Sequence, residues 1–251
     1  MDDPTPIYEQ PLRVSAMECD FKRELKPAAI FRHLSEAAAV HATQLGVGFE
    51  AMYARNLFWV HSRMRIRFCR FPRADEVVTL RTWPKDILRR LLYIRDFEVL
   101  DAEGERIAAA TSAWLIIDAT SRRLVSPKAV DLALPAASRR VGLDEPLDRL
   151  DLALEGEERL RVRAGYSAVD ILGHVNNSRY VDWICDAFPI EMYRDQRLEW
   201  LQVNYDHEVL PGQEVAILAS PRPEEPGLWA VEGRNCANDT RAFEALLQWR
   251  P

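Results

Sequence analysis

The sequence lacks the features that mark several broad classes of protein. It has only four cysteines, 10 glycines and no low-complexity tract in 251 residues. The cysteines form no CxxC pair and have no histidine at metal-ligand spacing, so we expect no metal site. The small number of glycines and the 48% of hydrophobic residues exclude collagen-like and disordered chains. They predict a globular protein of one large or two small domains.

Long apolar runs and a net positive charge are also missing. No apolar run approaches the roughly 20 residues that a membrane-spanning helix needs. The first ten residues, MDDPTPIYEQ, lack the basic and apolar regions of a secretory signal. The formal charge of −6 argues against a general nucleic-acid binder, whose binding face is usually basic. We therefore expect a cytoplasmic protein with no integral membrane segment and no nucleic-acid partner.

The predicted secondary structure repeats along the chain. The first half has a helix with one apolar stripe, followed by strands with alternating or apolar patterns: helix 27–45, then strands 58–68, 76–83, 91–100 and 106–117. A proline-bearing stretch with one short helix follows, and the second half repeats the order: strand 159–167, helix 176–193, then strands 197–208, 214–220, 228–234 and 241–249. This repeat predicts a duplication, with domains at 1–125 and 158–251 and a linker at 126–157.

A long helix wrapped by an antiparallel sheet, present twice in one chain, is a tandem (double) hotdog of the α+β class. Each copy alone would be a single sheet on one helix with an edge left to pair. The alternative is an α+β protein with two unrelated domains. The motif at residues 166–183 favours the tandem hotdog.

Polar residues gather where the second copy passes from strand to helix, in the run YSAVDILGHVNNSRYVDW at 166–183. Asn176 or Asn177 is a suitable N-cap, and the free N–H groups at the start of a helix stabilise negative charge. Gly173 permits a sharp turn and close approach of a substrate carbonyl. The candidate oxyanion donors at this helix N-terminus are Gly173, Val175, Asn176 and Asn177.

Several stretches in the same order carry a resemblance to a known family. They are LSEAAAVHATQLG, FWVHSRMRIRFCRFP, VTLRTWPKD, IRDFEVLDAEGERIAAATSAWLIIDATSRR, DILGHVNNSRYVDW and VNYDHEVLPGQEV. Over about residues 8–250 the chain resembles the acyl-acyl-carrier-protein (acyl-ACP) thioesterases of plant and bacterial fatty-acid synthesis, which are hotdog proteins. DxxxHVNNxxY alone would indicate only a hotdog thioesterase, and the blocks of the first half narrow the resemblance to this family.

The resemblance implies a catalytic group in the second copy. The family has an Asp-x-Asn-x-His run before the helix and a Glu on the next strand, which match Asp170, His174 and Glu208. Leu172 stands where the family has Asn, so no side-chain amide is available there. Asp20 occupies the position of Asp170 in the first copy, but the FKRELKP that follows it lacks the His-Val-Asn-Asn run. We therefore expect no catalytic centre in the first copy.

Thioester hydrolysis needs a nucleophile and oxyanion stabilisation, because a thiol of pKa about 8.5 is a good leaving group. Asp170 is expected to activate water or to attack the carbonyl directly, and Glu208 to orient or deprotonate the water. His174 is expected to position these groups by hydrogen bonding. Asp206 and His207 flank Glu208 and are the alternatives to it. If residues 206–208 lie on a strand, Asp206 and Glu208 share a face.

The resemblance also implies two surfaces for the substrate. The acyl tail would lie in the first copy against five residues: Leu34, Ala37, Ala38, His41 and Trp59. An acidic acyl carrier protein would dock on a basic cluster formed by Lys85, Arg89 and Arg90. Arg63, Arg65 and Arg67, on one face of a strand, are a second basic set that is equally well explained as solvation of the sheet.

The resulting prediction is an enzyme that hydrolyses fatty acyl-ACP, releasing free fatty acid and terminating chain elongation. It would need no cofactor, since the substrate carries the 4′-phosphopantetheine arm, and it would act as a monomer with an internal pseudo-dimer or as a homodimer. The alternatives are an acyl-CoA thioesterase, a catalytically silent acyl-binding protein and a hotdog dehydratase or hydratase. The last fits poorly, because Leu172 and the Asn pair after His174 depart from its Asp-x-Asn-x-x-His pattern.

Overall fold

The computed structural model describes residues 6–132, 134–135, 140–152 and 156–251. The chain divides into two compact units. The first comprises the residues up to Met64 and Cys69–Leu147, and the second comprises Arg65–Phe68 and Asp148–Pro251. The predicted linker 126–157 includes residues 133, 136–139 and 153–155, and the predicted first domain includes residues 1–5. All of these lie outside the described part.

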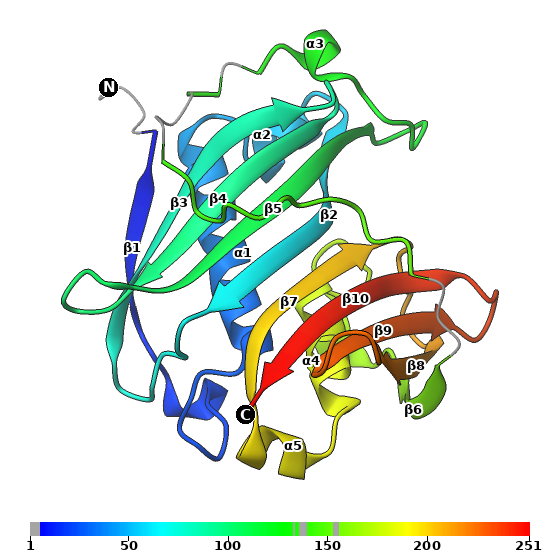
Figure 1. The fold of residues 1–251 in the computed structure, drawn as a ribbon. Coiled ribbons are helices and arrows are strands. Elements are labelled where there is room, and N and C mark those ends of the chain that lie inside the picture. The colour runs from blue at the N-terminus through cyan, green and yellow to red at the C-terminus, as the bar shows by residue number, and fades with distance from the viewer. Residues whose placement is uncertain (1–5, 133, 136–139, 153–155) are drawn as a thin grey trace. The chain divides into compact units, whose positions relative to one another are not determined.

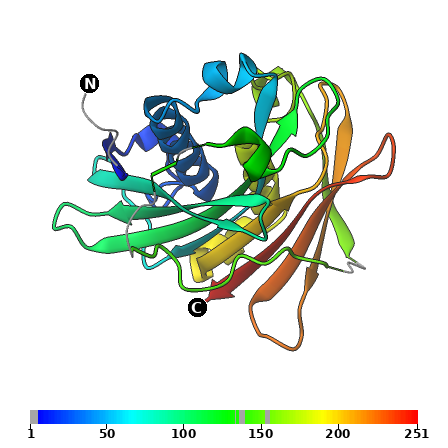
Figure 2. The same ribbon diagram turned by 90° about the horizontal axis from the view of Figure 1, so that it is seen from above.

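The first unit is a sheet with one long helix on one face (Figures 1 and 2). Its elements are β1 (Tyr8–Arg13), the 3-10 turn η1 (Ala16–Glu18), α1 (Pro27–Gln44), α2 (Phe49–Tyr53), β2 (Leu57–Phe68), β3 (Val77–Leu88), β4 (Leu92–Leu100), β5 (Arg106–Asp118) and α3 (Pro127–Val130). The last four residues of β2, Arg65–Phe68, are grouped with the second unit. The strands follow the order β1-β3-β4-β5-β2. The β1–β3, β3–β4 and β4–β5 pairs are antiparallel.

Helix α1 forms where the sequence predicts it. Pro27 occupies the first turn, where its missing N–H costs nothing, and the helix ends before Gly46, whose φ of +71° favours glycine. The face toward the sheet is buried and consists of Ala28, Ala29, Ile30, Phe31, Leu34, Ala37, Ala38 and His41. Burial of this stripe holds the helix against the sheet.

The second unit repeats this plan. Its elements are β6 (Glu157–Arg163), η2 (Tyr166–Ala168), α4 (Asn177–Asp186), α5 (Ile190–Asp195), β7 (Arg197–Tyr205), β8 (Glu214–Pro221), β9 (Leu228–Asn235) and β10 (Arg241–Arg250). Its strand order, β6-β8-β9-β10-β7, is that of the first unit when β6 is matched with β1 and β7 with β2. The shared order confirms the predicted duplication.

Three predicted boundaries in the second unit are wrong. The predicted helix 176–193 is two helices, because Pro189 lacks an N–H and disfavours helical geometry at Phe188; Pro189 itself has an extended ψ of 149°. The predicted strand 159–167 ends at Arg163 and gives way to η2. The predicted strand 197–208 ends at Tyr205, so the next three residues lie in a loop.

Candidate active site

The loop before α4 is closed by Asp170. Its backbone N–H donates to the carbonyl oxygen of His174 at 2.9 Å, and Oδ1 accepts from the N–H of Leu172 at 2.9 Å. Oδ2 lies 3.4 Å from Nδ2 of Asn176. Gly173 completes the turn with φ of +81°, a conformation that favours glycine. One carboxylate oxygen of Asp170 therefore shapes the loop, while the other is held more weakly.

Asn176 is the N-cap of α4. Its Oδ1 accepts from the N–H of Ser178 at 3.0 Å and from the Ser178 hydroxyl at 2.7 Å. This confirms one of the two predicted caps. Asn177 is the first residue of the helix, so its side chain is not the cap.

His174 and Glu208 lie together. Nε2 of His174 is 3.3 Å from Oε2 of Glu208, and the two side chains are 26% and 45% exposed. Glu208 stands in the loop after β7, so the expectation that it shares a strand face with Asp206 is wrong. The loop instead separates the two carboxylates.

Asp206 is engaged elsewhere. Its Oδ1 is 2.9 Å from Nη2 of Arg149, its Oδ2 is 2.8 Å from Nε of Arg241, and its side chain is only 7% exposed. His207 is exposed, and its Nδ1 lies 2.8 Å from the carbonyl oxygen of Arg241. These contacts favour Glu208 over both alternatives as the second carboxylate of the site.

Tyr180 links α4 to the loop that bears Glu208. Its hydroxyl makes a hydrogen bond with the backbone of Val209, and burial raises the pKa of Tyr180 well above its ordinary value. The N–H of Val175 donates to the carbonyl oxygen of Val209 at 2.9 Å. The loops on either side of the His174–Glu208 pair are thus tied together. Tyr180 is the tyrosine of DxxxHVNNxxY, and no role was predicted for it; its position one turn into the helix was the available signal.

The predicted oxyanion donors are mostly engaged. The N–H groups of Gly173, Val175 and Asn176 donate to the carbonyl oxygens of Asp170, Val209 and Ala168 at 3.0, 2.9 and 2.9 Å. The prediction is corrected for these three, because the turn and the cap use their N–H groups. Asn177 is the remaining candidate, since the first N–H groups of a helix have no intrahelical acceptor.

The five residues predicted to line an acyl pocket all lie in the first unit. Leu34, Ala37, Ala38 and His41 are buried on α1, while Trp59 is partly buried on β2 and its Nε1 donates to the carbonyl oxygen of Val47 at 2.8 Å. The helix stripe is therefore continuous from Leu34 to His41.

A buried arginine lies beside this stripe and was not predicted. Nη1 of Arg95 is 3.1 Å from Nδ1 of His41 and 3.2 Å from the Thr82 hydroxyl. Burial lowers the pKa of Arg95 to about 10, so it is still charged at neutral pH. An arginine in a strand is usually solvated, so the sequence holds no signal for its inward orientation.

The predicted docking cluster is split by the structure. Lys85 lies 2.9 Å from Oδ2 of the fully buried Asp96, so its charge neutralises that carboxylate. Arg89 and Arg90 are exposed at the β3–β4 turn, with φ of 51° and 53°. In the alternative set, Arg63 is buried and donates from Nε to the carbonyl oxygen of Leu147 at 2.9 Å. Arg89 and Arg90 are the part of the predicted cluster that stays on the surface.

Two family models together match nearly the whole described chain. The acyl-ACP thioesterase N-terminal domain matches residues 6–129, and the acyl-ACP thioesterase C-terminal domain matches residues 152–250. The chain belongs to the acyl-ACP thioesterase family. The resemblance drawn from the sequence blocks is confirmed.

Relatives of this acyl-ACP thioesterase family member include a chloroplastic palmitoyl-acyl carrier protein thioesterase of Arabidopsis thaliana. The two are 27% identical over 219 residues, which is 80% of this chain and 52% of the plant protein. The chain thus spans about half the length of this relative.

Among solved structures, an acyl-ACP thioesterase from Bacteroides thetaiotaomicron is 26% identical, with a TM-score of 0.88 over 98% of each chain. The 12:0-ACP thioesterase from Umbellularia californica has a TM-score of 0.84 at 21% identity over 98% of each chain, which shows the shared fold. The α+β tandem hotdog is confirmed.

In the part of the chain that the structure describes, no helix is both long and apolar enough to cross a membrane. Within the same residues, no group of three or more His, Cys, Asp or Glu side chains is placed to hold a metal ion.

Proposed function

We propose that this chain hydrolyses the thioester of fatty acyl-ACP, releasing a free fatty acid and terminating chain elongation. The observation that carries the proposal is the His174–Glu208 pair, 3.3 Å apart, beside the Asp170 loop at the start of α4. Membership of the acyl-ACP thioesterase family over both units supports the substrate class. The chain needs no cofactor in this proposal, because the thioester is activated by its own leaving group.

Glu208 acts as the general base in this proposal. His174 holds one carboxylate oxygen of Glu208, and the other can accept a proton from water as the water attacks the thioester carbon. The tetrahedral intermediate then expels the pantetheine sulfur, which takes up the proton as the C–S bond breaks. The N–H of Asn177, at the positive end of α4, would stabilise the oxyanion.

Asp170 supports this chemistry through the loop. Its Oδ1 is bound to the N–H of Leu172, which makes it a poorer nucleophile than a free carboxylate. Direct attack by Asp170 on the carbonyl is the competing path, and it would form an acyl anhydride on residue 170. Mass spectrometry of Glu208→Gln mixed with acyl-ACP tests this, because an adduct on residue 170 appears only if Asp170 is the nucleophile.

The acyl tail and the carrier are the other parts of the substrate that need a binding surface. The acyl tail would pack on the α1 stripe, where each buried CH₂ contributes roughly 0.8 kcal/mol. The acidic carrier would meet the exposed Arg89 and Arg90. Acyl-CoA also carries anionic phosphates, so charge at these arginines does not by itself choose between the two carriers.

A carrier panel tests the function. Acyl-ACPs and acyl-CoAs of several chain lengths are mixed with the full chain, and free thiol is measured with time. We expect faster release from acyl-ACP than from the matching acyl-CoA, and slower release from acyl-ACP by an Arg89→Gln/Arg90→Gln double variant. A higher kcat/KM for acyl-CoA would make the protein an acyl-CoA thioesterase. Binding of acyl-ACP without thiol release would make it a silent acyl-binding protein.

A further inference from the structure

The loops around the candidate active site expose large apolar side chains. Tyr166 and Ile171, in the segment that leads to α4, are 99% and 91% exposed. Leu172 in the same segment and Leu210 in the loop after β7 are 46% and 48% exposed. Single exposed apolar residues are common on protein surfaces, but several around one site indicate a contact surface. We refer to these four side chains as the apolar patch.

Backbone hydrogen bonds hold the two loops of the patch side by side. The N–H of Val175 donates to the carbonyl oxygen of Val209 at 2.9 Å, and the N–H of Gly212 donates to that of Ala164 at 2.8 Å. All four patch residues lie between these two bonds along their loops. The patch is therefore one surface at this end of the second unit, beside the candidate active site.

The first copy shows that the loop shape does not require this patch. Asp20 corresponds to Asp170, and Pro72, which accepts from the N–H of Leu25, corresponds to Val209. The residues of the first copy at the four patch positions are Ala16, Phe21, Lys22 and Arg73. Three of these four are small or basic, although the loop has the same hydrogen bonds. The patch is thus a feature of the second copy, and contact with another molecule accounts for it.

The charge of the two loops indicates what kind of molecule this is. Residues 164–178 and 206–213 contain no lysine or arginine, and they hold three acidic residues and two histidines. At their borders, Arg163 is opposite Glu214 in the register of β6 and β8, and Arg179 lies 3.0 Å from Asp182. This surface therefore attracts neither an acidic protein nor a phosphate. An uncharged ligand with apolar groups fits it better.

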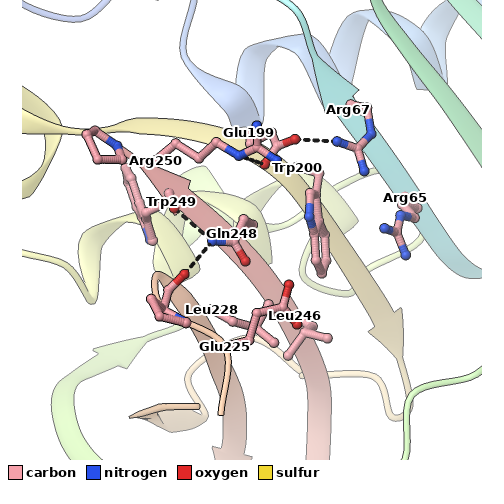
Figure 3. A pocket seen from close by; sticks show the side chains of 12 residues that line it. Arg65, Arg67, Glu199, Trp200, Glu225, Leu228, Leu246, Gln248, Trp249 and Arg250 are labelled. Atoms are coloured by element: carbon pink, nitrogen blue, oxygen red, sulfur yellow. Dashed lines mark hydrogen bonds and ion pairs between the residues drawn. The ribbon is translucent and has the colours of Figure 1, made fainter. Parts of the chain in front are cut away.

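The hollow around Trp200, on the sheet of the second unit, is a surface of a different character. Figure 3 shows Glu199 at its rim between Arg67 and Arg250, and Glu199 forms ion pairs with both. A charged rim is a poor match for an uncharged apolar ligand. The hollow therefore does not compete with the apolar patch for such a ligand.

We propose that the apolar patch binds the uncharged pantetheine part of the substrate's arm and thereby holds the thioester at the His174–Glu208 pair. The inference rests on the proposed function, in which the arm carries the thioester to this pair. Between its phosphate and its sulfur the arm has no formal charge, and two methyl groups on one carbon give it an apolar surface. Because acyl-ACP and acyl-CoA share this arm, the patch serves both and selects against thioesters with a shorter arm.

Thioesters of one fatty acid with arms of different length test the patch. Decanoyl-pantetheine and decanoyl-N-acetylcysteamine, which keeps only the end of the arm next to the sulfur, are mixed with the full chain, and free thiol is measured. We expect kcat/KM to be about tenfold or more higher for decanoyl-pantetheine, since its methyl groups are buried on the patch. Equal values would overturn the inference and leave the proposed function standing. No thiol release from any thioester, decanoyl-ACP included, would refute the proposed function itself.

A matched pair of double variants places the contact. Tyr166→Ser/Ile171→Ser should lower kcat/KM by about tenfold for decanoyl-pantetheine and by less than about twofold for decanoyl-N-acetylcysteamine, because only the longer arm covers the patch. Since the two side chains are 99% and 91% exposed, Tm should be unchanged. Met17→Ser/Phe21→Ser is the control on the loop of the first unit, where these side chains are 89% and 51% exposed, and it should change neither rate.

Three results with these variants would overturn the inference. Equal losses for the two thioesters in the Tyr166→Ser/Ile171→Ser variant would mean a disturbed catalytic loop. A loss with decanoyl-ACP alone would assign the patch to the body of the carrier protein. Sedimentation of the wild type, but not of this variant, with phosphatidylcholine vesicles would assign the patch to a lipid surface.

Discussion

Each unit has a loop of the same shape around an aspartate, Asp20 or Asp170, but the other residues of the two loops differ. In the first unit, Oδ1 of Asp20 accepts from the N–H groups of Lys22 and Glu24 at 2.8 and 3.0 Å, as Oδ1 of Asp170 accepts from Leu172. The N–H of Asp20 donates to the carbonyl oxygen of Glu24 at 2.8 Å, which matches the bond from Asp170 to His174. An aspartate that makes these bonds in both copies belongs to the loop scaffold.

The differences lie in the groups that the scaffold presents. Glu24 stands in the first unit where His174 stands in the second. The N–H of Leu25 donates to Pro72 as that of Val175 donates to Val209, so the buried Phe71 corresponds to Glu208. The first copy therefore has neither member of the His174–Glu208 pair. The two copies therefore share the aspartate and differ in this pair, which is the pair that the proposed mechanism uses.

The largest expected effect is on Glu208. Glu208→Gln should lower kcat for acyl-ACP by about 10³-fold with little change in KM, because it removes the base and leaves the shape of the side chain. Steady-state kinetics with a melting curve checks this, and Tm should be unchanged because Glu208 is half exposed.

Asp206→Asn is the matched control for the neighbouring carboxylate. It should lower Tm by about 2–6 °C, because Asp206 is buried and paired with Arg149 and Arg241, and it should keep most of the activity. If Asp206→Asn alone abolished turnover, the second carboxylate of the site would be Asp206.

The second-largest effect on kcat is expected at Asp170, and Asp20 in the first unit is its control. Asp170→Asn should lower kcat by about 10²-fold, since Asn keeps the Oδ1 acceptor of the turn but removes the negative charge beside the reacting groups. Asp20→Asn should change kcat by less than about twofold, because its copy lacks the pair. Equal losses in the two variants would mean that both copies contribute catalytic groups.

The fold was largely predictable because the periodicity of apolar residues indicates the elements of the first unit, and the duplication of their order indicates those of the second. Helix α1 and strands β2 to β5 follow from apolar spacing, and the repeat of their order predicted the second unit. The wrongly predicted boundaries lie where the chain leaves a helix or strand although the pattern of apolar residues continues. Pro189 splits a helix, and the residues after Tyr205 leave the sheet although their pattern continues it.

The candidate site was predictable in its residues but not in its hydrogen bonds. The motif supplied Asp170, His174 and Glu208, while the preference for Glu208 over Asp206 depends on Arg149 and Arg241, which lie far away in sequence. The oxyanion prediction failed for three N–H groups because turn and cap bonds cannot be read from residue types. Ion pairs and hydrogen bonds between residues far apart in the sequence therefore could not be predicted from the sequence.

A smaller effect is expected at Tyr180, which corresponds to Ile30 in the first copy. Tyr180→Phe should lower kcat by about fivefold, because the hydroxyl that bonds the Val209 backbone is lost and the Glu208 loop is held less firmly. Hydrogen exchange of the loop after β7 should rise in the variant. Unchanged exchange together with reduced kcat would assign Tyr180 a direct contact with substrate instead of a positioning role.

The smallest effect concerns the stability of the Asp20 loop in the first unit. Glu18 in the first unit corresponds to Ala168, since the N–H groups of Lys26 and Asn176 donate to their carbonyl oxygens. Only Glu18 ties its loop to the helix, with Oε1 3.2 Å from Nη2 of Arg32 and Oε2 2.9 Å from Nε2 of His33. Glu18→Ala should therefore destabilise the fold by about 0.5–1 kcal/mol at pH 7.

The pH dependence identifies the cause of that loss. Burial alone would raise the pKa of Glu18, but the hydrogen bonds and charges of His33 and Arg32 outweigh it and lower the pKa below its ordinary value of 4.5. A lowered folded pKa means that the contribution is present above 4.5 and is lost as the pH falls through the folded value. Unfolding free energies of wild type and Glu18→Ala should converge below that value. A constant difference down to pH 3 would show that Glu18 acts through packing, and the first loop would then need no charge to keep the shape it shares with the Asp170 loop.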